Sequence, residues 1–287
     1  MPQVVVLSLI LLGSIGLIVG LILFIVSRVF AVHTDERISR IESLLPNANC
    51  GGCGLPGCSA YAAKAVGQGS LDGLVCNACT AENRQLIASI LGSEAEILDE
   101  KVAVLRCNGT CGNRVSSQAE YDGAKTCSIA NMSGAGQWLC SYGCLGYGDC
   151  ANVCSFGAIS IDAESGIASV NPDICTGCGA CVKSCPRGLL MLAPKTKPQR
   201  RIWVACANRD KGPVARKSCS VACIGCGKCV SACAFDAITL ENNLAYIDQE
   251  KCRLCRKCES VCPQHSIVSL NFPKRRDEDS SPVQQNS

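Results

Sequence analysis

Hydrophobic and polar positions divide the chain into an apolar start, a long mixed body and a polar end. From Val4 to Val26 every residue is apolar or small, and none is charged. A helix rises about 1.5 Å per residue, so a segment of this length spans a hydrocarbon core of about 30 Å. The pattern therefore predicts one transmembrane helix, within residues 1–28.

A cleaved secretory signal is the alternative interpretation of this apolar start. The first residues, MPQ, lack a positive charge, and the apolar run is longer than the usual 7 to 15 residues of such signals. Arg28, Arg37 and Arg40 follow the run and no basic residue precedes it, which predicts a body on the cytoplasmic side. Gly16 and Gly20 form a GxxxG pattern, which either allows close approach of another membrane helix or marks small residues in an unpaired anchor.

Alternating apolar residues in the body predict β structure. Residues 158–170 alternate around a Ser-Gly pair and residues 237–248 around an Asn-Asn pair, so we expect a β-hairpin in each. Residues 102–107, VAVLRC, resemble residues 201–206, RIWVAC, and both are expected to be strands that end in a cysteine. The body is therefore predicted to be α+β.

Helical spacing and polarity define the remaining segments. Residues 81–100 have apolar residues at helical spacing, and residues 60–66 predict a short helix. The last segment has no apolar periodicity, and we expect it to be disordered. We expect a transmembrane anchor (1–28), a small helical four-cysteine module (29–82), a helical linker (83–100), two repeats (101–198 and 199–272) and a tail (273–287).

Cysteine is the residue that gives this body its chemistry. It supplies 26 of 287 residues, and sixteen of them form four runs with the spacing of ligands to cubane iron–sulfur clusters. In such a run three thiolates hold one cluster, and the fourth, which precedes a proline, ligates the neighbouring cluster. Two runs have the full motif, with Pro186 or Pro263 after the fourth cysteine; the other two are degenerate, with Ala234 and Ser155 in that place.

The runs lie in pairs, and a hairpin between the members of each pair would return the second run beside the first. We expect two ferredoxin-like modules with two 4Fe-4S clusters each. In the first module the predicted ligand sets are Cys140, Cys144, Cys150 and Cys185, and Cys175, Cys178, Cys181 and Cys154. In the second they are Cys223, Cys226, Cys229 and Cys262, and Cys252, Cys255, Cys258 and Cys233.

The similarity of the two halves extends upstream of these runs, which indicates a duplicated unit. GAKTC, ending at Cys127, resembles ARKSC, ending at Cys219, as VAVLRC resembles RIWVAC. If the halves pack about a pseudo-twofold axis, Cys107, Cys127, Cys206 and Cys219 converge on a sixth iron–sulfur site, which is a hypothesis. Cys111 has no counterpart, and we interpret it as a substitute ligand or a free thiol.

A separate cysteine motif precedes the repeats. NCGGCGLPGC supplies Cys50, Cys53 and Cys58, and Cys76 follows the predicted short helix. Its glycines, Gly51, Gly52, Gly54 and Gly57, are expected to adopt positive φ and to bring amide N–H groups close to inorganic sulfide. We predict a fifth 4Fe-4S cluster on these four cysteines, with Cys79 left over.

Zinc and disulfides are the alternatives for so many cysteines. Zinc sites normally use two separated CxxC pairs, whereas here the third and fourth cysteines follow directly. A disulfide framework belongs to oxidising compartments, which the apolar start and tandem motifs do not favour. The net charge of +3 gives no indication of nucleic-acid binding.

The order of these features resembles a known family. A single membrane helix, then NCGGCGLPGC with Cys76, then paired ferredoxin motifs, is similar to the B subunit of the Rnf complex, the ion-translocating ferredoxin:NAD oxidoreductase, in its long form with two ferredoxin modules. The resemblance implies a polyferredoxin subunit on the cytoplasmic face of the membrane. It would relay electrons between soluble ferredoxin and partner subunits that hold the flavin and NAD sites and the ion path.

The sequence motifs are consistent with a protein that relays electrons and does not itself make or break covalent bonds. No GxGxxG follows a predicted strand, and no hydrolase constellation is present. We expect the module of residues 201–270 to bind ferredoxin. We expect the Cys50 module, held on a tether at residues 30–48, to pass the electrons onward. The rival functions are an iron–sulfur subunit that reduces another target, such as a redox-sensing regulator, and a zinc-stabilised scaffold or iron–sulfur store.

Basic residues collect near the last cysteine run. Either they are solvated side chains that offset cluster charge, or they form a docking patch for an acidic ferredoxin. These residues are Lys251, Arg253, Arg256, Lys257 and Lys274 to Arg276. We interpret His33 and His265 as surface residues.

Overall fold

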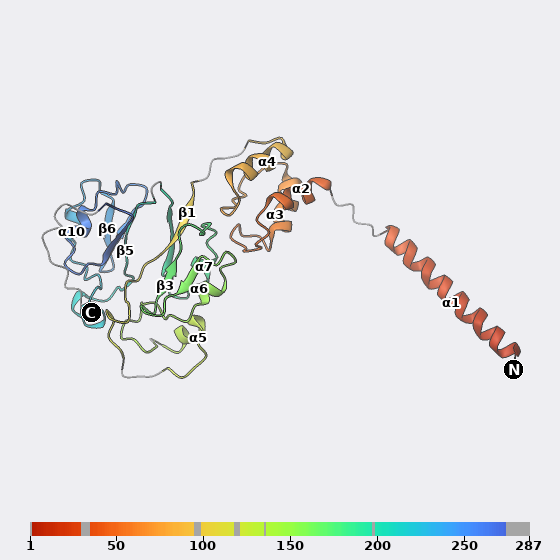
Figure 1. Ribbon diagram of the computed structural model, residues 1–287, viewed down its shortest axis with the longest axis horizontal. Coiled ribbons are helices and arrows are strands. Elements are labelled where there is room, and N and C mark those ends of the chain that lie inside the picture. Colours follow the sequence, from red (N-terminus) through yellow and green to blue (C-terminus); the bar gives the residue numbers. More distant parts are fainter. Residues whose placement is uncertain are drawn as a thin grey trace.

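The computed structural model describes residues 2–29, 35–94, 99–117, 121–134, 136–196 and 199–273. His33, the basic residues Lys274 to Arg276 and all but the first residue of the predicted tail lie outside these ranges. The described chain is a mixture of helices and small sheets. Figure 1 shows a long helix, α1, at one end, then a helical module, then two β-containing halves.

The apolar start forms helix α1 (Pro2–Val29). Its segment Leu9–Arg28 has a mean hydropathy of 3.0 and is long enough to cross a membrane, and none of that segment is buried against the rest of the chain. Leucine and isoleucine side chains such as Leu17, which is 71 % exposed, point outward along the helix. Such a surface is unfavourable in water and suits lipid, so the helix fits the predicted membrane anchor.

Three helices form the first module: α2 (Glu36–Leu44), α3 (Cys58–Gln68) and α4 (Ala81–Leu91). Helix α3 contains the predicted short helix. The core of the module joins Ile41 of α2, Ala62 of α3 and Ile87 of α4, each at most 1 % exposed. Thr80 caps α4, and Gly92 ends it in the left-handed conformation.

Two expectations about the boundaries of this module differ from the structure. Helix α4 has the packed face that the apolar spacing predicts, but it ends at Leu91, nine residues before the end of the expected helical linker. The expected tether, residues 30–48, contains α2, which packs into the same core. Apolar spacing predicts a buried face for α4 but not the core that covers it, and the sequence-based prediction contains no helix at α2.

The first β-containing half begins with β1 (Lys101–Leu105) and ends with β4 (Leu190–Pro194), which pair antiparallel. Between them, β2 (Ile159–Ile161) and β3 (Ala168–Val170) form the predicted hairpin. Short helices α5 (Cys127–Met132), α6 (Asp149–Asn152) and α7 (Ala180–Ser184) each contain a cysteine.

The second half has the same order of strand pairings. Strand β5 (Arg201–Val204) pairs with β8 (Ile267–Leu270), and β6 (Ile238–Glu241) pairs with β7 (Leu244–Ile247). Asn242 and Asn243 join the latter two with positive φ, as a two-residue hairpin turn requires. Helices α8 (Gly212–Ser218), α9 (Lys228–Ser231) and α10 (Lys257–Ser260) complete this half. Strands β4 and β8 are absent from the sequence-based prediction.

Backbone hydrogen bonds join the two halves directly. Asn108 N–H donates to Ala205 O (2.9 Å), and Ser220 N–H donates to Asn113 O (2.8 Å). The Trp203 indole N–H donates to Leu105 O at 2.8 Å. The loops that follow β1 and β5 therefore meet, and each of these loops carries a cysteine.

Candidate metal centres

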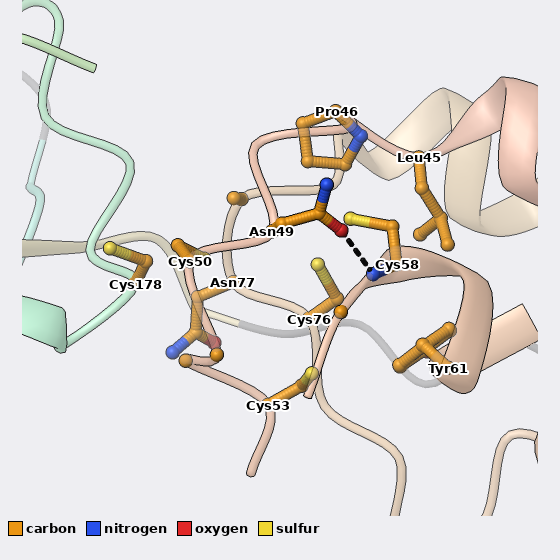
Figure 2. Close-up of a pocket in the computed structure, with 14 residues that line it drawn as sticks. Leu45, Pro46, Asn49, Cys50, Cys53, Cys58, Tyr61, Cys76, Asn77 and Cys178 are labelled. Atoms are coloured by element: carbon orange, nitrogen blue, oxygen red, sulfur yellow. Dashed lines mark hydrogen bonds between the residues drawn. The ribbon is translucent and has the colours of Figure 1, made fainter. Parts of the chain in front are cut away.

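The first cysteine motif surrounds a cavity of about 390 Å³. Cys50, Cys53, Cys58 and Cys76 all line it, as expected from the sequence, and Figure 2 shows them around one space. The Asn49 side-chain oxygen accepts a hydrogen bond from Cys58 N–H at 2.8 Å, which fixes the start of α3 and the direction of that thiol. The loop and the helix start together build the cavity.

The glycines of this motif have two different roles. Gly51 and Gly54 have φ of 65° and 83°, in the region where only glycine is free of strain. A Cβ at Gly52 would overlap the carbonyl oxygen of Cys178, so Gly52 permits close approach to the first ferredoxin half. Gly57 has an extended backbone, with φ of 172°, and does not show the positive φ that we expected.

A second cavity, of about 390 Å³, lies in the first β-containing half. Its cysteines are Cys127, Cys144, Cys150 and Cys185. The sequence-based set has Cys140 in place of Cys127, so the arrangement differs from that expectation. The Asp149 carboxylate accepts hydrogen bonds from the N–H groups of Cys127 (2.8 Å) and Ser128 (3.0 Å), which brings the start of α5 to this cavity.

A third cavity, of about 420 Å³, lies where the two halves meet. Its cysteines are Cys107, Cys140, Cys206 and Cys219. The structure therefore brings both halves to one site, as the hypothesis of a shared site required, but Cys140 takes the position that we expected for Cys127. We call this space the shared cavity.

A signal for the correct grouping is present in the sequence. Cys140 and Cys144 are separated by three residues, as are Cys219 and Cys223. If the sequences of the two halves are aligned on this spacing, Cys140 corresponds to Cys219, and Tyr147 corresponds to Cys226. Cys127 then supplies the thiol that Tyr147 cannot. The CxxC template instead aligns Cys140 with Cys223, and this alignment produced the different grouping.

A fourth cavity, of about 370 Å³, lies in the second half. It is lined by Cys223, Cys226, Cys229 and Cys262, the set expected from the sequence. Strands β5, β6 and β7 contribute apolar side chains to its wall. The fourth cysteine of the last run therefore returns to the third run, as the hairpin between the two runs predicts.

The pKa shifts of the remaining cysteines show which thiols are near enough to affect one another. Burial, then the neighbouring charges of Cys175, Cys178 and Cys154, raises the pKa of Cys181 to about 11. The pKa of Cys258 is raised to about 12, chiefly by burial and then by Cys252 and Cys255. Burial, then Cys255 and Cys233, also raises the pKa of Cys252. The neighbours named here are members of the two sets that the sequence predicts, and these two sets stay predictions.

Two cysteines, Cys79 and Cys111, belong to none of these six sets. Cys79 is 7 % exposed and packs in the core of the first module, where its pKa is raised by burial. Cys111 is exposed, and its backbone N–H donates to Ser165 O at 2.9 Å. Its sulfur lies 3.9 Å from a guanidinium nitrogen of Arg114. This placement favours the interpretation of Cys111 as a free thiol.

The residues present suit iron–sulfur clusters better than single ions or disulfides. All 26 cysteines are unpaired. Within the ranges that the structure describes, no three Cys, His, Asp or Glu side chains are close enough to hold one metal ion. The thiols instead surround wider spaces. Two N–H groups in the wall of the shared cavity, Arg114 Nε and Trp138 Nε1, are buried without a hydrogen-bond partner in the described chain, so they are donors available to a bound anionic group.

Neighbouring cysteine sets are close to one another throughout the body. Cys178 lines the cavity of the first module, where its pKa is raised by burial and then by Cys50. The Cys181 charge contributes to the raised pKa of Cys150. These two interactions connect the set in the first module with the two sets in the first half.

The series continues through the shared cavity. Cys144 N–H donates to Cys107 Sγ (3.4 Å), and Cys223 N–H donates to Cys206 Sγ (3.3 Å). The Cys229 charge contributes to the raised pKa of Cys258. The six sets therefore form one series, which begins at Cys50 and ends at Cys252.

The last set lies near the surface. Cys255 is exposed, and so are Lys251, Arg253 and Lys257 around it. Arg256 is held differently: it pairs with Glu259 at 2.7 Å and stacks on Phe272 at 5.2 Å. Among the residues that the structure describes, we therefore define the exposed basic surface as Lys251, Arg253 and Lys257.

Comparison with protein families identifies the same segments. Residues 139–189 and 222–266 both match the family described as "4Fe-4S dicluster domain", and a second family of that description matches residues 174–237. Residues 45–73 match a family described as "Putative Fe-S cluster". These matches cover both ferredoxin-like modules and the first cysteine motif.

Curated relatives match nearly the whole chain. The B subunit of the Na(+)-translocating ferredoxin:NAD(+) oxidoreductase complex of Acetobacterium woodii is 48 % identical over 90 % of this chain and 75 % of that protein. The B subunit of the proton-translocating ferredoxin:NAD(+) oxidoreductase complex of Clostridium ljungdahlii is 38 % identical over 93 % of each. The B subunit of the ion-translocating oxidoreductase complex of Methanosarcina acetivorans is 39 % identical over 93 % of this chain and 99 % of that protein.

Proposed function

The chain belongs to the family of B subunits of ion-translocating ferredoxin:NAD oxidoreductases, and from this premise we propose that it relays electrons between soluble ferredoxin and the partner subunits of such a complex. The family and the 4Fe-4S domains establish an iron–sulfur electron-transfer subunit. The direction of the relay along the chain, its two ends and its ligand sets are our proposal.

The observation that carries the proposal is the continuous series of cysteine sets. We assign one 4Fe-4S cluster to each set, six in all, and each cluster would supply reversible one-electron transfer. The chain holds the sets in place by contacts such as that between Cys178 and Cys50, and no set is isolated from the next. An enzyme that makes or breaks covalent bonds does not need such a series of metal sites, whereas a protein that relays electrons does.

The ligand sets follow the structure rather than the sequence where the two differ. We propose Cys127, Cys144, Cys150 and Cys185 for the second cavity and Cys107, Cys140, Cys206 and Cys219 for the shared cavity. The other sets are those expected from the sequence. The duplicated strand order and the two matches to one dicluster family support a duplicated unit, with the shared cavity at its pseudo-twofold junction.

We propose that ferredoxin meets the second half. The exposed thiol Cys255 and the basic surface of Lys251, Arg253 and Lys257 lie together there, and a basic surface attracts an acidic carrier at long range. The first module lies at the other end of the series and is the first module after α1 along the chain, so it would exchange electrons with membrane partners (Figure 1). A body on the cytoplasmic side follows from Arg28, Arg37 and Arg40.

The experiment is anaerobic isolation of the chain with its partners in mild detergent, followed by iron and sulfide counting. Six clusters correspond to about 24 irons per chain. Reduction by reduced ferredoxin is then followed by EPR in the parent and in Arg253→Gln with Lys257→Gln. We expect slower reduction of the double variant at low salt and a smaller difference at high salt, because salt screens this attraction.

Arg40→Gln with Lys64→Gln is the matched control, since it removes the same two charges from exposed residues of α2 and α3 in the first module. An equal effect of this control would show that only net charge matters and that ferredoxin does not meet the second half. A preparation without iron would contradict the relay, and reduction of a regulator in place of the complex would favour the rival function.

A further inference from the structure

The shared cavity differs from the others in the number of donors that face its sulfurs. Cys206 Sγ accepts from Cys223 N–H (3.3 Å) and Asn208 N–H (3.4 Å). Cys107 Sγ accepts from Cys144 N–H (3.4 Å), and Cys140 Sγ from the Asn208 side-chain amide (3.6 Å). Three of its four thiol sulfurs therefore accept the bonds named here.

The other sets receive fewer such bonds in the described chain. Cys175 accepts from Ala103 N–H and Cys154 from Ala158 N–H, which are ligands of one set. Cys185 accepts from Leu189 N–H, and Cys262 from Ser266 N–H. In the same two sets, backbone hydrogen bonds also oppose the rise in the pKa of Cys127 and of Cys229, whereas in the shared cavity they do so for Cys219 as well, so that all four of its sulfurs are acceptors. Hydrogen bonds to ligand sulfur stabilise the more negative, reduced form of a cluster and raise its potential.

Asn208 is built into this position. It is 1 % exposed, and its side-chain oxygen accepts from Asp210 N–H at 2.7 Å, which leaves its amide nitrogen to face Cys140 and Ser218. Ser218 in turn donates to Ala215 O at 2.9 Å, so it accepts from Asn208. A buried amide held on both sides has little freedom to turn away from the sulfur.

Arg114 adds a buried positive charge in the wall of the same cavity. It is 8 % exposed, and its guanidinium stacks on Trp138 at 4.0 Å. Its terminal nitrogens donate to Cys144 O (2.6 Å) and Gly166 O (3.0 Å). No carboxylate pairs with it within the residues that the structure describes. A buried cation without a carboxylate needs another negative partner, which the thiolates of this site would supply.

From these contacts we infer that Arg114 and Asn208 are positioning residues that give the shared cavity the highest reduction potential of the six sites. This inference rests on the proposed function, because it needs an iron–sulfur cluster on Cys107, Cys140, Cys206 and Cys219. One electron from reduced ferredoxin adds one negative charge there, and no bond is made or broken. The nearby cation and the N–H donors favour that charge, so the electron rests at the junction of the two halves.

The test is an EPR-monitored redox titration of the complete chain, prepared without oxygen. Cys206→Ser first identifies the signal of the shared cavity as the one that it removes. We expect that signal to titrate at the highest potential in the parent chain. In Arg114→Gln the ratio of reduced to oxidised site at a fixed potential should fall about tenfold, a shift of 59 mV for one electron, while the other signals stay in place.

Arg216→Gln is the matched control, since Arg216 is an exposed arginine of α8 and has the same charge. In this variant the EPR signal of the shared cavity should titrate at the same potential as in the parent chain. If Arg114→Gln loses iron, Asn208→Asp carries the test, because it keeps the shape of the side chain and replaces the donor by an acceptor. In Asn208→Asp the EPR signal of the shared cavity should also titrate at a lower potential than in the parent chain.

Two different failures are distinguishable. If Cys206→Ser loses no iron, the sixth cluster of the proposed function is wrong. If that variant does lose one cluster, but the shared signal of the parent lies within the range of the others, the inference about Arg114 and Asn208 is overturned. An unchanged shared signal in an iron-replete Arg114→Gln or Asn208→Asp overturns it as well.

Discussion

The carboxylate of Asp149 accepts a hydrogen bond from the backbone N–H of Cys127 at 2.8 Å, across a sequence separation of 22 residues. The second carboxylate oxygen accepts from Ser128 N–H (3.0 Å) and from its hydroxyl (2.8 Å). These donors lower the pKa of Asp149 although partial burial opposes the shift. One side chain on α6 thus holds the start of α5, and with it the thiol of Cys127, at the second cavity.

The first prediction concerns Asp149. Asp149→Ala should remove three hydrogen bonds from the start of α5 and cost about 1–3 kcal/mol of stability, since charge-assisted bonds of this kind are stronger than neutral ones. We expect the cluster of the second cavity to be lost faster on exposure to a chelator, measured by iron release. Asp149→Asn, which keeps an acceptor, should be intermediate.

Asp162→Ala is the control for this experiment. Asp162 also accepts a backbone hydrogen bond, from Ser165 N–H at 3.1 Å, but in the β2–β3 turn rather than beside a ligand. Iron release as slow in Asp149→Ala as in Asp162→Ala would show that Cys127 is not held by this carboxylate.

The second prediction separates the two possible groupings of Cys127 and Cys140. If Cys140 and Cys206 serve one cluster, the double variant Cys140→Ser with Cys206→Ser should lose only about four irons. Cys127→Ser with Cys206→Ser should lose about eight, because two clusters are then affected. The grouping expected from the sequence gives the opposite result, so iron counts on these two double variants decide between them.

The difference between these groupings shows what the sequence can and cannot predict. Spacing predicted the hairpins, the short helix of the first module and the two groups of cysteines that line the first and fourth cavities, because those depend on short-range geometry. The place of Cys127 depends on Asp149, and the place of Cys140 depends on how the two halves meet. Long-range contacts of this kind have no local pattern. Helix α2 is a similar case: its buried residue Ile41 was visible as an apolar position but not as part of a core.

The third prediction concerns helix α1. None of the segment Leu9–Arg28 is buried against the body, and no residue of α1 lines the four cysteine cavities. Removal of residues 2–29 should therefore release the chain from membranes and leave its iron content unchanged. The measurement is iron per chain in the membrane and supernatant fractions after a high-salt wash, with the complete chain as the control. A shortened chain that stays with the membranes would show that another surface anchors it.

The last prediction concerns the contact between the first module and the first half. A Cβ at Gly52 would overlap the backbone carbonyl of Cys178, which a neighbouring side chain cannot relieve by turning away. Asn77 Nδ2 donates to Gly177 O (3.2 Å) and Lys183 Nζ to Gly51 O (3.2 Å), so the two parts meet over a small polar contact. In Figure 2 Cys178 enters from a separate segment beside Cys50. Gly52→Ala should push these parts away from each other and weaken the magnetic coupling between the two reduced sites, as measured by EPR, without loss of iron.

Gly67→Ala is the matched control, since a Cβ there meets no atom within 4 Å and Gly67 lies inside helix α3. Because alanine is the better helix former, this variant should gain about 0.5–1 kcal/mol of stability and keep the coupling of the parent chain. Equal coupling in Gly52→Ala and Gly67→Ala would mean that the close approach of Gly52 to Cys178 does not set the distance between the sites. Weaker coupling in Gly52→Ala alone would show that this contact sets the distance over which the proposed relay passes electrons between the first half and the first module.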